Sequence, residues 1–161
     1  MLTRAADYAV RVMIHLAALP PGTRAQRTTL AEATEVPDSF MSKVLQGLVR
    51  ARMVSSKPGH QGGFELAADP REVTLLDVVE AIDGPLAVNL CVAANRGCER
   101  HQGCPAHHVW VEAQEAFSRV LRSATIASLA PHLLVKVELG ARGDRQSTEA
   151  PTPTRASVPL Q

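Results

Sequence analysis

The chain has 161 residues, of which 45% are hydrophobic and only 3% aromatic, and its formal net charge is +1. This size allows one or two small units with a real core and excludes a large enzyme barrel. A core of Ala, Val, Leu and Ile favours helices over an all-β fold. No apolar run approaches the roughly 20 residues that span a bilayer, and the first residues lack signal-peptide blocks. We therefore expect a cytoplasmic protein without membrane contact.

The positive charge is concentrated in one part of the chain. Residues 39–64 contain no acidic residue, whereas acidic residues outnumber basic ones over residues 67–106. A local basic face is where contact with nucleic acid is expected, because the net charge alone suggests none. The cations of this segment are Lys43, Arg50, Arg52 and Lys57.

Three helices are predicted in the first 50 residues. Apolar residues at three- and four-residue steps predict a helix over 2–19, which the following Pro-Pro-Gly ends. A second, short helix is expected from Thr28 or Thr29, with Thr28 as N-cap. A third helix opens at Pro37 or Asp38 and runs to residue 49. The second and third helices, joined by a short turn, form a candidate helix-turn-helix.

A β-hairpin is predicted directly after the third helix. Residues 53–56 and 64–66 are typical of two strands, and the loop between them is rich in Gly. A helix-turn-helix followed by a hairpin indicates a winged helix, in which the third helix enters a major groove and the hairpin lies along the DNA backbone or in the minor groove. We therefore predict a mainly α fold with a small β-hairpin wing, and a winged helix-turn-helix DNA-binding domain over 1–83.

Candidate DNA-contacting residues lie on the third helix and on the wing. Polar positions opposite the apolar stripe of the third helix could donate to base edges or phosphates. Gly and donor side chains in the hairpin loop allow close approach to the DNA backbone. A solvated helix face and an ordinary Gly-rich hairpin are the simpler alternatives. The candidates are Ser39, Ser42, Lys43, Gln46, Lys57, Gly59, His60 and Gln61.

The second half of the chain is predicted to hold a capped helix, an irregular loop and a long helix. Thr74 caps a helix that ends at residue 82, with Asp77 at its third position. Residues 84–106 lack periodicity, as a ligand-bearing loop would. A helix over 107–129, in a segment 107–130, is expected to pack on the first helix and on its copy in a homodimer. Residues 131–161 are predicted to form a tail, largely disordered from 144.

All three cysteines lie in the irregular loop. An odd number excludes complete pairing into disulfides within one chain. The wide separation of Cys91, Cys98 and Cys104 favours an iron–sulfur cluster over zinc, whose ligands are usually closer in sequence. A fourth ligand could be His107, or Asp7 from the first helix of a second copy. Buried thiols acting as small apolar groups are the alternative. No catalytic motif is present, so we expect no enzyme.

An ordered set of motifs over residues 1–130 resembles the Rrf2 family of winged-helix transcription regulators. The motifs are Leu2-Thr3, Asp7-Tyr8-Ala9-Val10, Leu45-Gln46-Gly47-Leu48, Val54-Ser55-Ser56, Gly59-His60-Gln61-Gly62-Gly63-Phe64-Glu65-Leu66, Thr74-Leu75-Leu76-Asp77-Val78-Val79 and the triple-cysteine loop.

The resemblance implies a cytoplasmic homodimer that binds a palindromic promoter site in double-stranded DNA and changes its affinity with the state of an iron–sulfur cluster. Cys104-Pro105-Ala106-His107 followed by Trp110 is similar to IscR-like members, in which a histidine helps to hold a 2Fe-2S cluster. Asp7 stands where NsrR-like members place an aspartate that ligates a 4Fe-4S cluster across the dimer. Both cluster types remain open.

The sequence therefore predicts a transcription repressor controlled by an iron–sulfur cluster. One alternative is a winged-helix regulator without a cofactor, which senses through thiol oxidation or a protein partner. An alternative of another class is an iron–sulfur carrier with no role on DNA.

Overall fold

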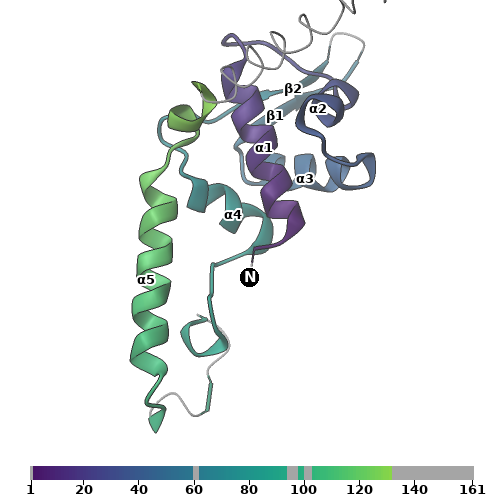
Figure 1. Cartoon of the computed structure of the whole chain (residues 1–161). Coiled ribbons are helices and arrows are strands. Elements are labelled where there is room, and N and C mark those ends of the chain that lie inside the picture. The colour runs from purple at the N-terminus through teal and green to yellow at the C-terminus, as the bar shows by residue number, and fades with distance from the viewer. Residues whose placement is uncertain (1, 60–61, 94–97, 100–102, 132–161) are drawn as a thin grey trace, which may run out of the picture.

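The computed structural model describes residues 2–59, 62–93, 98–99 and 103–131. These residues form a helical fold with one two-stranded antiparallel hairpin, as predicted (Figure 1). From the N-terminus the elements are α1 (Arg4–Ala18), α2 (Arg27–Thr34), α3 (Asp38–Arg50), β1 (Val54–Lys57), β2 (Gly63–Leu66), α4 (Leu75–Asp83), the 3-10 turn η1 (Leu90–Val92) and α5 (His107–Ser123).

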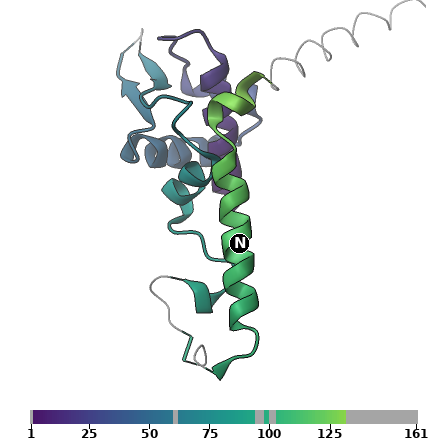
Figure 2. The same ribbon diagram turned by 90° about the vertical axis from the view of Figure 1, so that its left-hand side faces the viewer.

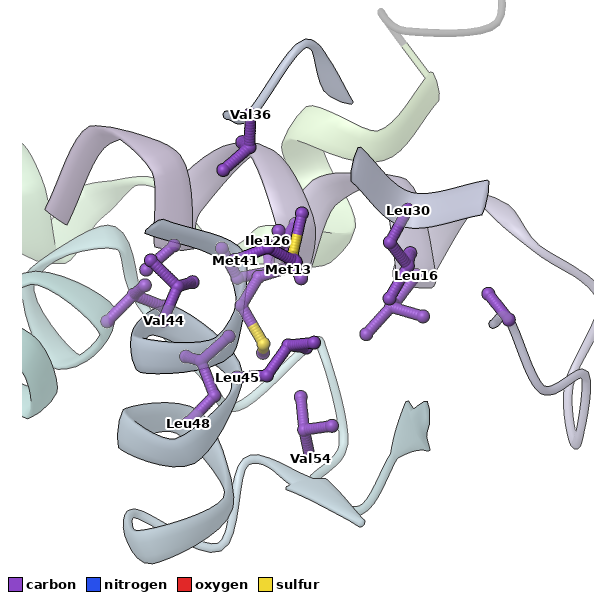
Figure 3. Packing of buried hydrophobic residues seen from close by; sticks show 14 of the residues in the cluster. Met13, Leu16, Leu30, Val36, Met41, Val44, Leu45, Leu48, Val54 and Ile126 are labelled. Atoms are coloured by element: carbon purple, nitrogen blue, oxygen red, sulfur yellow. The ribbon is translucent and has the colours of Figure 1, made fainter. Parts of the chain in front are cut away.

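A hydrophobic core joins α1, α2, α3, β1 and the segment after α5 (Figure 3). Met13 comes from α1, Leu30 from α2 and Leu45 from α3, and all three are fully buried. The apolar stripes that predicted these helices therefore face one another. Other buried members of this core are Leu16, Val36, Met41, Val44, Leu48, Val54 and Ile126.

Helices α3 and α4 approach each other closely at Gly47. A Cβ atom at this position would lie 2.6 Å from Cδ1 of Ile82 on α4, which is closer than two carbon atoms can pack. The absence of a side chain at Gly47 thus leaves room for the end of the Ile82 side chain against α3.

Strand β1 lies one residue later than the predicted 53–56, and β2 begins one residue before the predicted 64–66 and ends at the same residue. Val54 pairs with Leu66 and Lys57 pairs with Gly63. Ala25, just before α2, adds a short extra rung, because it exchanges two backbone hydrogen bonds of 2.9 Å with Phe64. The wing is therefore attached to the chain that enters α2.

This attachment explains why the predicted N-cap of α2 was wrong. The N-cap is Gln26 rather than Thr28, and its side chain makes no capping hydrogen bond. Its Nε2 instead donates to the carbonyl oxygen of Gly62, at 2.8 Å. The helix begins where the chain leaves the hairpin edge, so tertiary pairing overrides the local capping preference.

Two N-caps hold α4 and α1 in place. The predicted capping box of α4 is confirmed, because the backbone N–H of Asp77 donates to Oγ1 of Thr74 at 3.2 Å and the backbone N–H of Thr74 donates to Oδ2 of Asp77 at 2.8 Å. Thr3 caps α1 and also donates through Oγ1 to Asp83 at the end of α4, at 2.6 Å. The start of α1 is thereby tied to the end of α4.

The long helix predicted over 107–129 is interrupted. Helix α5 ends at Ser123, and Ala124 is extended. The carbonyl oxygen of Ala124 accepts from the backbone N–H of Leu75 at 2.9 Å, and the N–H of Ile126 donates to the carbonyl oxygen of Val73 at 2.9 Å. This pairing supplies a partner to the first N–H of α4, which the helix itself cannot satisfy. Helical residues resume at Ile126.

Helix α5 extends away from the winged half of the molecule (Figures 1 and 2). It packs mainly on α4 and η1 rather than on α1, which differs from the expectation. Within the described residues, no helix is both long and apolar enough to cross a membrane.

The burial of Ile126 predicts how strongly the segment after α5 contributes to the fold. Ile126→Ala should lower the free energy of unfolding by about 2–5 kcal/mol, because it opens a cavity in the core, as measured by urea denaturation. Leu90→Ala trims a side chain of similar size that is 60% exposed, and it should cost less than about 1 kcal/mol. Equal midpoints for Ile126→Ala and the wild type would contradict this packing.

Candidate functional site

The polar residues predicted on the third helix all lie on the outer face of α3. Ser39, Ser42, Lys43 and Gln46 are exposed. The opposite face is buried in the core through Met41, Val44, Leu45 and Leu48. Burial of one face fixes the rotation of the helix about its axis, so these four side chains point to solvent together.

A groove lies between α3 and the hairpin. It has a volume of about 490 Å³ and is lined by both apolar and polar side chains. Such a groove combines guanidinium, hydroxyl and amide donors beside apolar surface, which suits a sugar–phosphate chain. Its lining residues are Arg27, Ser42, Leu45, Gln46, Val49, Arg50, Ser56 and Phe64.

Sequence reasoning missed Arg27 and Ser56 as candidate contacts. It counted Arg50 among the cations of the acid-free segment but did not single it out as a contact. Arg27 comes from α2, and only the fold brings it beside α3. Its guanidinium donates to Asp38 in the first turn of α3, which links the starts of the two helices.

The base of the wing is held by several contacts. Besides the hydrogen bond from Gln26 to Gly62, Arg24 forms an ion pair of 2.9 Å with Glu65. A Cβ atom at Gly62 would lie 2.1 Å from the carbonyl oxygen of Lys57, so only glycine fits there.

The wing tip is described only in part. Lys57 and Gly59 are exposed, and Gly59 has a φ of +99°, which favours glycine. His60 and Gln61, the other two predicted tip residues, lie outside the described residues.

The cysteines lie at the other end of the molecule. Cys91 is the middle residue of η1, which contacts α5, and Figure 1 shows η1 far from the hairpin. Cys91, Cys98 and Cys104 are all half-buried. The carbonyl oxygen of Cys104 accepts from the backbone N–H of His107 at 3.1 Å, so this pair adjoins the start of α5. Nδ1 of His107 is buried.

The donors fit an iron–sulfur cluster in kind. Three half-buried cysteines and an imidazole on one segment are ligands that such clusters use. In the described part of the chain, however, no group of three or more His, Cys, Asp or Glu side chains could hold a metal ion. The ligand set therefore stays a prediction.

The other predicted ligand, Asp7, belongs to a different part of the molecule. It is exposed on α1, where its carboxylate pairs with Arg11 at 2.9 Å. Ligation by Asp7 would require it to leave this ion pair.

A third surface is apolar and lies along α5 and the start of α1. Trp110, Phe117 and Val120 of the predicted stripe are exposed, Val120 by 62%, as is Leu2. Leu2 and Phe117 also line a cavity of about 480 Å³ with the chain before η1. Exposed apolar side chains on one stripe are typical of a surface that is covered in an assembly.

The sequence is similar to several transcription regulators. It is 43% identical to the putative HTH-type transcriptional regulator Rv1287 of Mycobacterium tuberculosis over 82 residues, 51% of each chain. The chain thus spans about half the length of this relative. It is 31% identical to the HTH-type transcriptional regulator NsrR of Bacillus subtilis over 129 residues, 80% of this chain and 88% of NsrR.

A solved structure supports the fold. CymR (YrzC) of B. subtilis, described as the global cysteine regulator, is similar with a TM-score of 0.67 and 22% identity, over 82% of this chain and 97% of CymR. A family model described as an iron-dependent transcriptional regulator matches residues 2–132. The chain therefore belongs to the Rrf2 family, a family of transcriptional regulators rather than enzymes.

Proposed function

We propose that this chain is a cytoplasmic, homodimeric repressor that binds a palindromic site in promoter DNA and changes its affinity with the state of an iron–sulfur cluster. The observation that carries the DNA-binding part is the exposed polar face of α3 beside a groove lined by Arg27 and Arg50. Membership of a family of transcriptional regulators supports it.

The groove offers a path for one DNA strand. If α3 occupies a major groove and the wing the adjacent minor groove, the sugar–phosphate chain that separates these grooves must cross between α3 and the hairpin. Arg27 and Arg50 would neutralise its phosphates, and Ser42 and Ser56 would donate to phosphate oxygens. Reading of base edges then falls to Gln46 and its neighbours on α3.

Two substitutions separate these roles. Arg50→Ala should weaken binding to any sequence and lower the slope of log K against log salt concentration by about 1, because one phosphate contact is lost. Gln46→Ala should cost about 1–3 kcal/mol and relax the preference at one base position. Fluorescence anisotropy over a salt series, on a site selected from random oligonucleotides, measures both effects.

Arg71→Ala is the matched control, because Arg71 is an exposed arginine that is not part of the groove. It should change neither slope nor preference. If Arg50→Ala left the salt slope unchanged, the proposal that a DNA strand runs through the groove would be contradicted.

Dimerisation through α5 would cover the exposed apolar stripe. A two-fold contact places two copies of α3 in successive turns of a palindromic site, roughly 34–36 Å apart. Trp110 and Phe117 supply large apolar area to such a contact.

Val120→Glu tests this interface. The charge should disrupt the dimer because it would be desolvated without a partner, while the monomer tolerates it at a position that is 62% exposed. Light scattering should give the monomer mass, and DNA affinity should fall. Arg122→Glu, on another side of α5, is the control and should leave a dimer. A dimeric Val120→Glu variant would exclude this surface.

The cysteine segment is the proposed sensing site. Cys91, Cys98 and Cys104 would each ligate the cluster, with His107 or the Asp7 of a second copy as fourth ligand. When bound, the cluster supplies a centre that oxidants or nitric oxide can alter. The iron-dependent description of the family supports this part, as does the segment's supply of three thiols and an imidazole.

Anaerobic reconstitution with iron and sulfide should give visible absorption that Cys91→Ala abolishes, because one of three thiolate ligands is lost. Mössbauer spectroscopy then distinguishes 2Fe-2S from 4Fe-4S. His107→Ala and Asp7→Ala then test the two candidates for the fourth ligand, because only the loss of the true ligand should change the spectrum. His108→Ala, at the exposed neighbour of His107, is the control and should leave the spectrum unchanged.

Absence of absorption in the wild type would overturn the cluster proposal. Loss of DNA binding on thiol oxidation would then favour a regulator without a cofactor. A cluster-loaded protein that binds no DNA would instead be an iron–sulfur carrier.

A further inference from the structure

One side chain of α5, Gln114, makes hydrogen bonds to the segment that carries Cys91. The amide of Gln114 accepts from the backbone N–H of Val88 through Oε1 at 2.8 Å, and its Nε2 donates to the carbonyl oxygen of Leu86 at 2.8 Å. Only one orientation of the amide satisfies both bonds. Gln114 therefore pairs with the segment as a peptide group of a neighbouring strand would.

The pairing is partly shielded from water. Gln114 and the two backbone groups are partly buried, and Nε2 also donates to Oγ of the buried Ser118 at 3.3 Å. Because an unpaired polar group in such a place is costly, the segment has one strongly favoured position on α5. Val88 is three residues before Cys91, and the two are joined by Asn89, the N-cap of η1, and Leu90, its first residue.

Groups other than Gln114 also hold the loop. The backbone N–H of Leu86 donates to Oε1 of Glu80 on α4 at 3.0 Å. On the far side of the loop, Cys104 is held at the start of α5 by its own hydrogen bond with His107. Cys91 and Cys104 are thus positioned by different groups.

We propose that Gln114 is the positioning residue for Cys91: its side-chain amide holds the chain before η1 against α5 and so sets the access of reagents and ligands to the Cys91 thiol. This inference rests on the proposed sensing role of the segment for its functional meaning. A change at Cys91 that displaces η1 would have to break the Gln114 pairing, and would thereby reach the helix that carries the proposed dimer surface.

The test uses the full-length protein without metal, so it does not depend on cluster assembly. Alkylation by iodoacetamide is followed at Cys91 and Cys104 separately by mass spectrometry. Gln114→Leu removes all three hydrogen bonds at similar volume. It should accelerate alkylation of Cys91 about tenfold, as expected when the two hydrogen bonds to Leu86 and Val88 no longer oppose a local opening of the segment. Cys104 in the same molecules should react at the wild-type rate.

Two further variants keep the test decisive. Gln114→Glu retains the acceptor for Val88 but loses the donor to Leu86, so it should give an intermediate rate at Cys91. Glu115→Gln changes the exposed neighbour on the same helix and should react as the wild type does.

Equal acceleration at Cys91 and Cys104 in both Gln114 variants would indicate general loosening and overturn the inference, as would an unchanged rate at Cys91. Selective acceleration at Cys91 would support it, even if the protein bound no cluster and the proposed sensing function failed.

Discussion

The burial of one face of α3 is the constraint on which the rest of the structure depends. Leu45 and Leu48 are fully buried among residues of α1, α2 and β1, and this fixes the rotation of α3 about its axis. The outward face, the groove and the hairpin beside it all follow from that one orientation. A DNA-reading surface requires such rigidity, because contacts with bases are directional and a rotating helix would present no constant pattern of donors.

Helix α4 is the physical link between the two halves of the molecule. It touches α3 where Gly47 meets Ile82, it holds the start of α1 through Asp83, and it pairs with Ala124 just after α5. The cysteine segment starts directly after α4 and returns to α5. A displacement of that segment can therefore reach α3 through these packed elements, and a coupling of about 1–3 kcal/mol is enough for regulation.

The sequence was sufficient to predict those elements in which the local residue pattern and the tertiary structure agree. The apolar period of α3, the Gly-rich hairpin and the capping box at Thr74 each predicted what the structure shows. The sequence was insufficient where hydrogen bonds to distant backbone groups decide where a helix begins or ends. The one local signal near Ala124 is Thr125, whose Oγ1 accepts from the backbone N–H of Ser128 at 3.2 Å as an N-cap does, and the pairing with residues 73–75 makes the break. Thr28 has the chemistry of a cap, but the bond between Ala25 and Phe64 sets the start of α2.

The same distinction, between local pattern and tertiary structure, applies to the residues of the candidate sites. Ser42 and Gln46 could be placed on one face from helical spacing, whereas Arg27 joins them only through the fold. Gln114 has no sequence signal at all, since a glutamine on a helix is usually a solvated side chain.

We propose that the state of the cysteine segment changes the DNA affinity of α3. The most direct test is the affinity of the wild-type protein for one DNA site, at one salt concentration, with and without the reconstituted cluster. We expect the two affinities to differ by about 5- to 150-fold. Identical affinities for the two forms would contradict it.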